Sequence, residues 1–169
     1  MIVTVDTTAK MLHADGRSIS CSIGRSGAVA ADAKREGDHM TPLGEWPIRA
    51  ALFRPDRSAP PPGFALPWRW IRPDDGWCDD PADTGYNRPV RLPYPASAER
   101  MWRGDHAYDI VLILGHNDAP PVPGIGSAIF FHLTNDRPFT EGCIAVGRTA
   151  IDALLPKITR ESRMVIGRE

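Results

Sequence analysis

Short apolar and β-branched runs, separated by turn-forming residues, make up most of the chain. The 17 Pro and 15 Gly residues interrupt these runs before they reach the length of a typical helix. The pattern predicts a mainly β fold, because β-branched and aromatic residues favour extended strands. The expected strands cover residues 2–5, 18–23, 46–53, 108–114, 127–133, 143–146 and 163–166.

One segment near the C-terminus has a different periodicity. Apolar residues recur at three- and four-residue steps over 151–158, which places them on one face of an α-helix. We expect Thr149 to be the N-cap and Pro156 to end or bend the helix. The prediction is therefore a mainly β fold with one or two short helices.

The segment from about residue 54 to 103 has little periodicity and holds most of the prolines. It is long for a structureless loop in a compact domain, so we expect an ordered excursion that builds one wall of a site. A disordered linker is the alternative, which the Trp and Tyr residues of the segment disfavour. The length of 169 residues predicts a single domain over 1–169 that includes this excursion.

Composition excludes several classes of function. The formal net charge of -1 provides no field that would gather nucleic acid or an anionic membrane, and no run approaches the roughly 20 apolar residues of a membrane span. The three cysteines have neither a disulfide framework nor zinc spacing. The N-terminus lacks the pattern of a signal peptide, which predicts a cytoplasmic protein. A periplasmic or envelope location is the alternative if the sequence is truncated.

Cys143 is the strongest candidate for a nucleophile. Gly142 lacks a Cβ and permits a tight turn, in which the N–H groups of Gly142 and Cys143 could face an oxyanion. His132 ends an apolar run, and strand alternation places it on the same face as Phe130 and opposite Phe131. A lone histidine of this kind is commonly satisfied by one backbone bond, but a Gly-Cys turn eleven positions later favours a catalytic pair.

The other two cysteines have less favourable settings. Cys21 lies in a strand-like run and is expected in the core. Cys78 is a weaker alternative nucleophile, because its neighbours Asp79 and Asp80 would raise its pKa.

Two motifs resemble those of the L,D-transpeptidase catalytic domain, also called the YkuD domain. Residues 41–46 (TPLGEW) resemble its TPxGxF/W segment, and His132 followed by Thr140-x-Gly142-Cys143 resembles its His...[S/T]-x-G-C signature. The resemblance covers about residues 18 to 148 and implies a β-sandwich. It also implies that the cysteine attacks the bond between the L-centre of meso-diaminopimelate and the terminal D-Ala of a peptidoglycan stem. The histidine would be the base, held by a backbone carbonyl near Leu133.

The chain departs from the family pattern at two positions near the cysteine. Glu141 replaces the usual second histidine, and Ala145 replaces the usual arginine two residues after the cysteine. Arg148 is a candidate for the missing cation that would bind a substrate carboxylate, with a solvated strand-end charge as the alternative. In the excursion, Asp residues beside residues 86–88 suit a zwitterionic substrate, with a plain polar turn as the alternative. The expected substrate-binding residues are Thr140, Glu141, Arg148, Asn87, Tyr86 and Asp80.

A thioester at Cys143 can be resolved by water or by an amine. With no export signal in the sequence, the favoured function is an L,D-carboxypeptidase that trims muropeptide tetrapeptides during peptidoglycan recycling. The alternative is an L,D-transpeptidase that forms crosslinks, and a minor alternative is a non-catalytic glycan- or peptide-binding module with tryptophan stacking platforms. An unreactive Cys143, unlabelled by a carbapenem, would indicate the binding module. We expect a stem peptide or muropeptide as substrate, and neither a metal nor another cofactor.

Overall fold

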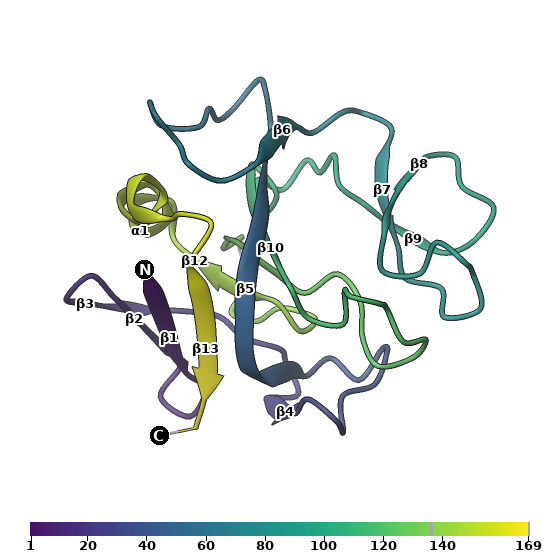
Figure 1. The fold of residues 1–169 in the computed structure, drawn as a ribbon, viewed down its shortest axis with the longest axis horizontal. Helices are drawn as coiled ribbons and strands as arrows, with labels where there is room; N and C mark the ends of the chain where they lie inside the picture. The colour runs from purple at the N-terminus through teal and green to yellow at the C-terminus, as the bar shows by residue number, and fades with distance from the viewer. Residues whose placement is uncertain (136, 169) are drawn as a thin grey trace.

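A computed structural model of the protein describes residues 1–135 and 137–168, and most of its regular structure is β (Figure 1). The strands are β1 (Ile2–Asp6), β2 (Met11–Ala14), β3 (Arg17–Ser20), β4 (Ala28–Ala30), β5 (Thr41–Phe53), β6 (Trp68–Trp70), β7 (Asp75–Cys78), β8 (Pro89–Arg91), β9 (Ala98–Arg100), β10 (Ile110–Leu114), β11 (Phe130–Leu133), β12 (Ile144–Val146) and β13 (Arg163–Gly167). One α-helix, α1 (Arg148–Leu154), continues into the 3-10 helix η1 (Leu155–Lys157).

The long strand β5 joins two groups of strands. Its residues 44–47 pair with β13, whereas residues 48–53 pair with β10. The order of the large sheet is β12-β11-β10-β5-β13-β1-β2-β3, and β4 and β6 also pair with β5. Figure 1 shows β13 and β1 on one side of β5 and β10 on the other. The mainly β, sandwich-like class predicted from the sequence is confirmed.

The main hydrophobic core takes side chains from both groups of strands. Val5 and Met164 come from β1 and β13, and Leu112 and Phe131 come from β10 and β11; all four are fully buried. Burial of apolar surface at roughly 25 cal/mol per Å² is the largest favourable term for such a core. The two groups are therefore held together by packing as well as by β5.

A second hydrophobic cluster lies on the opposite face of β11. It contains Phe130, Trp77 and Cys143, and the Trp77 ring meets Phe130 edge-on at a centroid distance of 5.1 Å. Phe131 belongs to the main core and Phe130 to this second cluster, which confirms the predicted alternation along the strand. The candidate nucleophile thus lies beside a rigid aromatic cluster.

The expected N-cap of the helix is wrong. Gly147 is the N-cap, no side chain caps the helix, and Thr149 lies inside α1. The carbonyl of Gly147 accepts the N–H groups of Ala150 and Ile151, so the first turn starts before Thr149. The helix ends at Leu154 before Pro156, as predicted, and buries Ile151 and Leu154.

All seven predicted strands are present, but the segment 18–23 is only partly a strand. It ends at Ser20, after which Ser22 and Gly24 form isolated bridges with Ala145 and Thr140. Strands β2, β4 and β6–β9 were not predicted, and β5 begins earlier than expected. The bridges hold residues 22–24 directly beside the turn that carries the candidate nucleophile.

The excursion of residues 54–103 is ordered. It contains β6, which adds to β5, and a separate three-stranded sheet in the order β8-β7-β9. Figure 1 shows this small sheet projecting away from β1, β13 and both termini. In the parts of the chain that the structure describes, no helix is both long and apolar enough to span a bilayer.

Candidate active site

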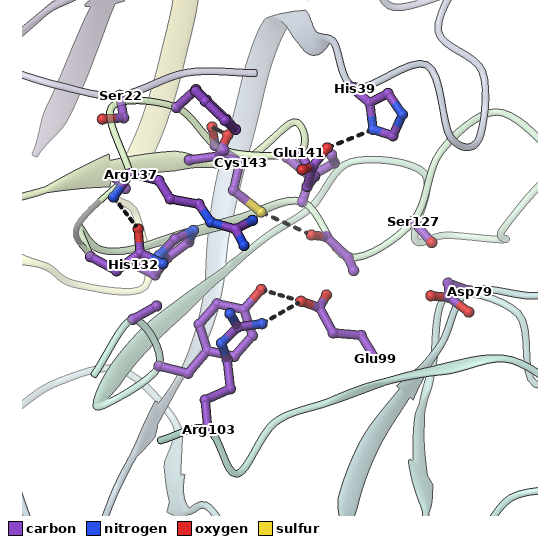
Figure 2. A pocket seen from close by; sticks show the side chains of 18 of the residues that line it. Ser22, His39, Asp79, Glu99, Arg103, Ser127, His132, Arg137, Glu141 and Cys143 are labelled. Atoms are coloured by element: carbon purple, nitrogen blue, oxygen red, sulfur yellow. Dashed lines mark hydrogen bonds and ion pairs between the residues drawn. The ribbon is translucent and has the colours of Figure 1, made fainter. Parts of the chain in front are cut away.

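A cavity of about 400 Å³ lies between the β11–β12 region and the excursion. Cys143 and His132 line it on one side, and Asp79, Glu99 and Arg103 line it on the other (Figure 2). The two candidate catalytic residues are therefore brought to the same cavity, and the excursion supplies a wall of it.

Parallel pairing of β11 and β12 explains why these two residues meet. The register places Phe131 opposite Ile144 and His132 opposite Ala145. Cys143, the residue before Ile144, therefore lies level with Phe130. Phe130 is two residues from His132 along β11, a separation of about 7 Å. Long side chains on one sheet face can interact across such a diagonal.

The turn before Cys143 is closed by Thr140. Its hydroxyl donates to the Cys143 carbonyl at 2.7 Å and accepts the Gly142 N–H at 3.1 Å. Gly142 has a φ of +138°, and an added Cβ would lie 3.1 Å from the Met40 carbonyl oxygen. Glycine is required here for both reasons. The Gly142 N–H is already engaged, so it does not face an oxyanion as the sequence suggested.

The Cys143 thiol is directed toward the backbone of residues 128–130. The sulfur accepts the Phe130 N–H at 3.3 Å, and the thiol donates to the Ala128 carbonyl at 3.2 Å (Figure 2). No hydrogen bond joins Cys143 to His132 among the described residues. Burial, and then the charge of Glu99, raise the pKa of the thiol to about 12. The resting cysteine is therefore a neutral thiol.

His132 has a fixed orientation. Its Nδ1 lies 2.8 Å from the Leu133 carbonyl oxygen, and the ring meets Tyr108 edge-on at 5.0 Å. A carbonyl only accepts hydrogen bonds, so Nδ1 carries the proton and Nε2 keeps its lone pair. Burial lowers the pKa of His132 to about 4. The imidazole is therefore a neutral base at physiological pH.

The two residues thus form a neutral pair rather than a thiolate–imidazolium pair. A thiol with a raised pKa and an imidazole with a lowered pKa do not exchange a proton at rest. Such a pair can act by general-base catalysis, in which the proton moves as the sulfur attacks.

The two positions that depart from the family pattern, Glu141 and Ala145, both line the cavity. The Glu141 carboxylate lies at the cavity edge, 2.7 Å from Nδ1 of His39 and 3.1 Å from Nε of Arg25. A histidine is thus present near this turn, but it comes from another segment. Ala145 pairs through its backbone with Ser22, and both residues line the cavity.

Arg148 lies outside the cavity. Its Nε binds the Asp152 carboxylate at 2.9 Å on the exposed side of α1. Because a helix begins at this residue, its side chain follows the helix surface instead of turning toward Cys143. Arg137 is the arginine on this side of the cavity, and Figure 2 shows its side chain extending toward Cys143.

The structure brings Thr140 and Glu141 to the cavity, but not Asp80, Tyr86 or Asn87. The Tyr86 hydroxyl donates to Glu36 at 2.5 Å, and Asp80 accepts the Ala82 N–H within a turn. Asn87 is buried, and its side chain holds the Trp77 indole and the backbone of neighbouring loops. The polar-turn alternative therefore describes most of this cluster.

Sequence reasoning missed Glu99 and Arg103 as cavity residues. They are spaced like a helical i,i+4 pair, but Glu99 lies in a strand and no motif marks either residue. The neighbouring Asp79 was noticed as part of an acidic cluster. Only the pairing of β7 with β9 shows that Asp79 and Glu99 approach the same cavity.

The other thiols are buried away from the cavity. Cys21 belongs to the main core, and burial raises its pKa to about 11. Burial, more than the neighbouring carboxylates, raises the pKa of Cys78. Across residues 1–135 and 137–168, no group of three His, Cys, Asp or Glu side chains could hold a metal ion.

Residues 1–166 match the family model of the L,D-transpeptidase catalytic domain, YkuD. The chain belongs to this family. The L,D-transpeptidase catalytic domain is a cysteine-enzyme family, and the motif residues Thr140, Gly142 and Cys143 form one hydrogen-bonded turn here.

Solved L,D-transpeptidases are similar in structure but distant in sequence. One from Mycobacterium smegmatis has a TM-score of 0.46 and 12% identity, covering 98% of this chain and 58% of that one. One from Xylanimonas cellulosilytica has a TM-score of 0.42 and 13% identity, covering 98% of this chain and 59% of that one. This chain therefore spans less than two thirds of the length of either protein. No curated protein matches the sequence.

Proposed function

We propose that the protein is an L,D-carboxypeptidase that removes the terminal D-Ala from peptidoglycan stem tetrapeptides, with Cys143 as nucleophile and His132 as general base. The observation that carries the proposal is the placement of both residues on one cavity, with His132 held in the tautomer in which Nε2 keeps its lone pair. Membership of the L,D-transpeptidase family supplies the class of substrate.

In the first step, the thiol proton moves to Nε2 of His132 as the sulfur bonds to the carbonyl carbon. The C–N bond then breaks, and the D-Ala amine leaves with the proton from His132. A thioester remains on Cys143. Because the resting thiol is neutral, the base must act during the attack.

The turn itself limits how the oxyanion can be stabilised. The Gly142 N–H is committed to Thr140, which leaves the Cys143 N–H as the donor that this turn would offer. Other hydrogen-bond donors, from the substrate side or from a rearranged turn, would have to supply the remaining stabilisation of the oxyanion.

In the second step, water attacks the thioester while His132 takes its proton. The C–S bond breaks, the sulfur recovers a proton, and a carboxylate is released. The cavity of about 400 Å³ is large enough for the end of a stem peptide beside Cys143 and His132. A crosslinking reaction must also hold a second stem. A role in muropeptide recycling inside the cytoplasm is part of this proposal.

The test is incubation of the purified protein with a free or disaccharide-linked tetrapeptide, followed by mass spectrometry. The expected product has lost one alanine, and Cys143→Ala should form none of it. The control Cys78→Ala, which removes a buried thiol outside the cavity, should retain activity. Release of D-Ala by Cys143→Ala, or none by the wild type, would overturn the proposal. A dimer or an exchanged D-amino acid would instead identify a transpeptidase.

A further inference from the structure

The wall of the cavity that faces Cys143 is acidic. Asp79 and Glu99 line it, and we call these two residues the acidic wall. Trp77 of β7 pairs with Glu99 of β9, and side chains alternate along a strand. Asp79, two residues after Trp77, therefore lies on the same face as Glu99. The small sheet of the excursion thus directs both carboxylates into one space (Figure 2).

Part of each carboxylate already has a partner, and part does not. Oε1 of Glu99 accepts the Tyr108 hydroxyl at 2.6 Å and lies 3.7 Å from Nη1 of Arg103. No described residue binds its Oε2. Oδ1 of Asp79 is buried and has no hydrogen-bond partner among the described residues. Two carboxylate oxygens on this wall therefore lack donors.

Ser127 provides a third acceptor without a donor. The residue lines the cavity and is only 6% exposed, and its Oγ makes no hydrogen bond within the described chain. The Ser127 hydroxyl can act only as a donor toward the Tyr86 oxygen, because the Tyr86 hydroxyl donates to Glu36, so the lone pairs of Ser127 Oγ stay unused. Buried polar groups are almost always hydrogen-bonded in native proteins. A buried hydroxyl with unused lone pairs, in the same cavity as two such carboxylates, indicates that the donor belongs to a ligand.

The negative charge of the wall is only partly balanced by the protein. The Arg103 guanidinium is engaged by Asp105 through two hydrogen bonds, at 2.9 and 2.5 Å. Lys34, which also lines the cavity, is bound by Asp38 at 2.6 Å. Glu99 itself is destabilised as a carboxylate, because burial and nearby Asp79 both raise its pKa. A cation from the ligand would relieve this cost.

We propose that Asp79, Glu99 and Ser127 form a subsite that binds a primary ammonium group of the substrate. An ammonium has three N–H donors. The cavity offers three acceptor atoms that receive no hydrogen bond from the described chain: Glu99 Oε2, Asp79 Oδ1 and Ser127 Oγ. The inference rests on the proposed acyl transfer at Cys143, and it makes the acidic wall the specificity element of that reaction. The ammonium can belong to the side chain of the acyl donor or to an amine acceptor.

The test compares two tetrapeptides that differ only at the side-chain amine of the third residue, which is free in one and acetylated in the other. The wild type should show a kcat/KM at least about tenfold higher for the free amine. Asp79→Asn and Glu99→Gln should bring this ratio close to one, whatever each variant does to the absolute rate on the acetylated peptide. Asp74→Asn is the matched control, because it removes an exposed carboxylate next to the same small sheet.

Two further measurements separate this subsite from the proposed function. Calorimetric binding of both peptides to Cys143→Ala tests the ammonium preference without catalysis, and the preference should again vanish in the double variants with Asp79→Asn or Glu99→Gln. Carbapenem labelling of Cys143 in the single variants should persist, which shows an intact nucleophile.

The possible outcomes are distinct. Binding preference without D-Ala release would overturn the proposed function but support the subsite. Equal binding and turnover of the two peptides by the wild type, with no effect of the variants on use of an added amine acceptor, would overturn the subsite. Variants that change only the KM for an added amine acceptor would support the subsite and assign the ammonium to the acceptor.

Discussion

Nδ1 of His132 lies 2.8 Å from the carbonyl oxygen of Leu133, the next residue in the chain. This contact fixes the imidazole tautomer without a carboxylate partner, and the charge of Asp105 has only a minor raising effect on the pKa of the ring. The surrounding burial then lowers the pKa of the ring to about 4. Orientation and basicity are therefore set by separate features of the same site.

The pH dependence of acylation follows from this arrangement. The base form of His132 is required, so kcat/KM should fall about tenfold per pH unit only below about pH 4 and stay level from there through neutral pH. With the ordinary histidine pKa of about 6.5, activity would already be lost about 2.5 pH units higher. The rate of carbapenem acylation, measured between pH 3.5 and 8, shows where activity begins to fall on the acidic side. A half-maximal rate near pH 6.5 would contradict the prediction.

The reactivity of Cys143 should be low at rest and sensitive to Glu99. Because its pKa is raised to about 12, iodoacetamide should label it slowly at pH 7, and the rate should rise about tenfold per pH unit up to at least pH 9. Glu99→Gln removes a charge that raises this pKa and should accelerate labelling at any pH in this range. Mass spectrometry of the Cys143 peptide gives the rates. Equal acceleration by Asp74→Asn would show that Glu99 has no specific effect.

The turn before Cys143 depends on the Thr140 hydroxyl. Thr140→Val keeps the side-chain shape but leaves the Gly142 N–H and the Cys143 carbonyl without their shared partner. We expect a loss of about 2 kcal/mol in the free energy of unfolding and slower acylation of Cys143. Thr140→Ser retains the hydroxyl and should keep most of the stability and most of the acylation rate. Urea unfolding compares the three proteins, and equal stability of the Val and Ser variants would show that these bonds contribute little.

Asn87 should stabilise the site without touching the substrate. Its Oδ1 accepts the Ala128 N–H at 3.1 Å, and the Ala128 carbonyl in turn accepts the Cys143 thiol. Asn87→Ala removes this link and leaves the Trp77 indole N–H unpaired, so the free energy of unfolding should fall by about 3 kcal/mol.

Asn87→Asp keeps the Oδ1 acceptor but loses the Nδ2 donor to the Asn117 carbonyl. We expect intermediate stability for this variant, measured by thermal and urea unfolding. If Asn87→Ala instead raised KM for the peptide without changing stability, Asn87 would be a substrate contact.

Local sequence was sufficient for much of the fold and for the central part of the site. Apolar runs between Pro and Gly predicted seven of the thirteen strands found in the described residues, and strand alternation predicted that Phe130 and Phe131 face different clusters. The Gly-Cys motif identified a turn whose φ of +138° only glycine adopts readily. These features depend on residues close together in the chain, and so they can be read from it.

The roles of the polar residues around the site were decided by tertiary structure. Arg148 starts a helix and pairs with Asp152, the Gly142 N–H is taken by Thr140, and Asn87 is buried among backbone groups. Glu99 carries no sequence signal, yet the pairing of β9 with β7 places it opposite Cys143. Such roles depend on which distant segments pack together, because burial and neighbouring charges set the direction and the pKa of each side chain. The sequence by itself singled out the Gly-Cys turn and the histidine eleven residues before it as candidates, whereas the tertiary structure decided what faces them.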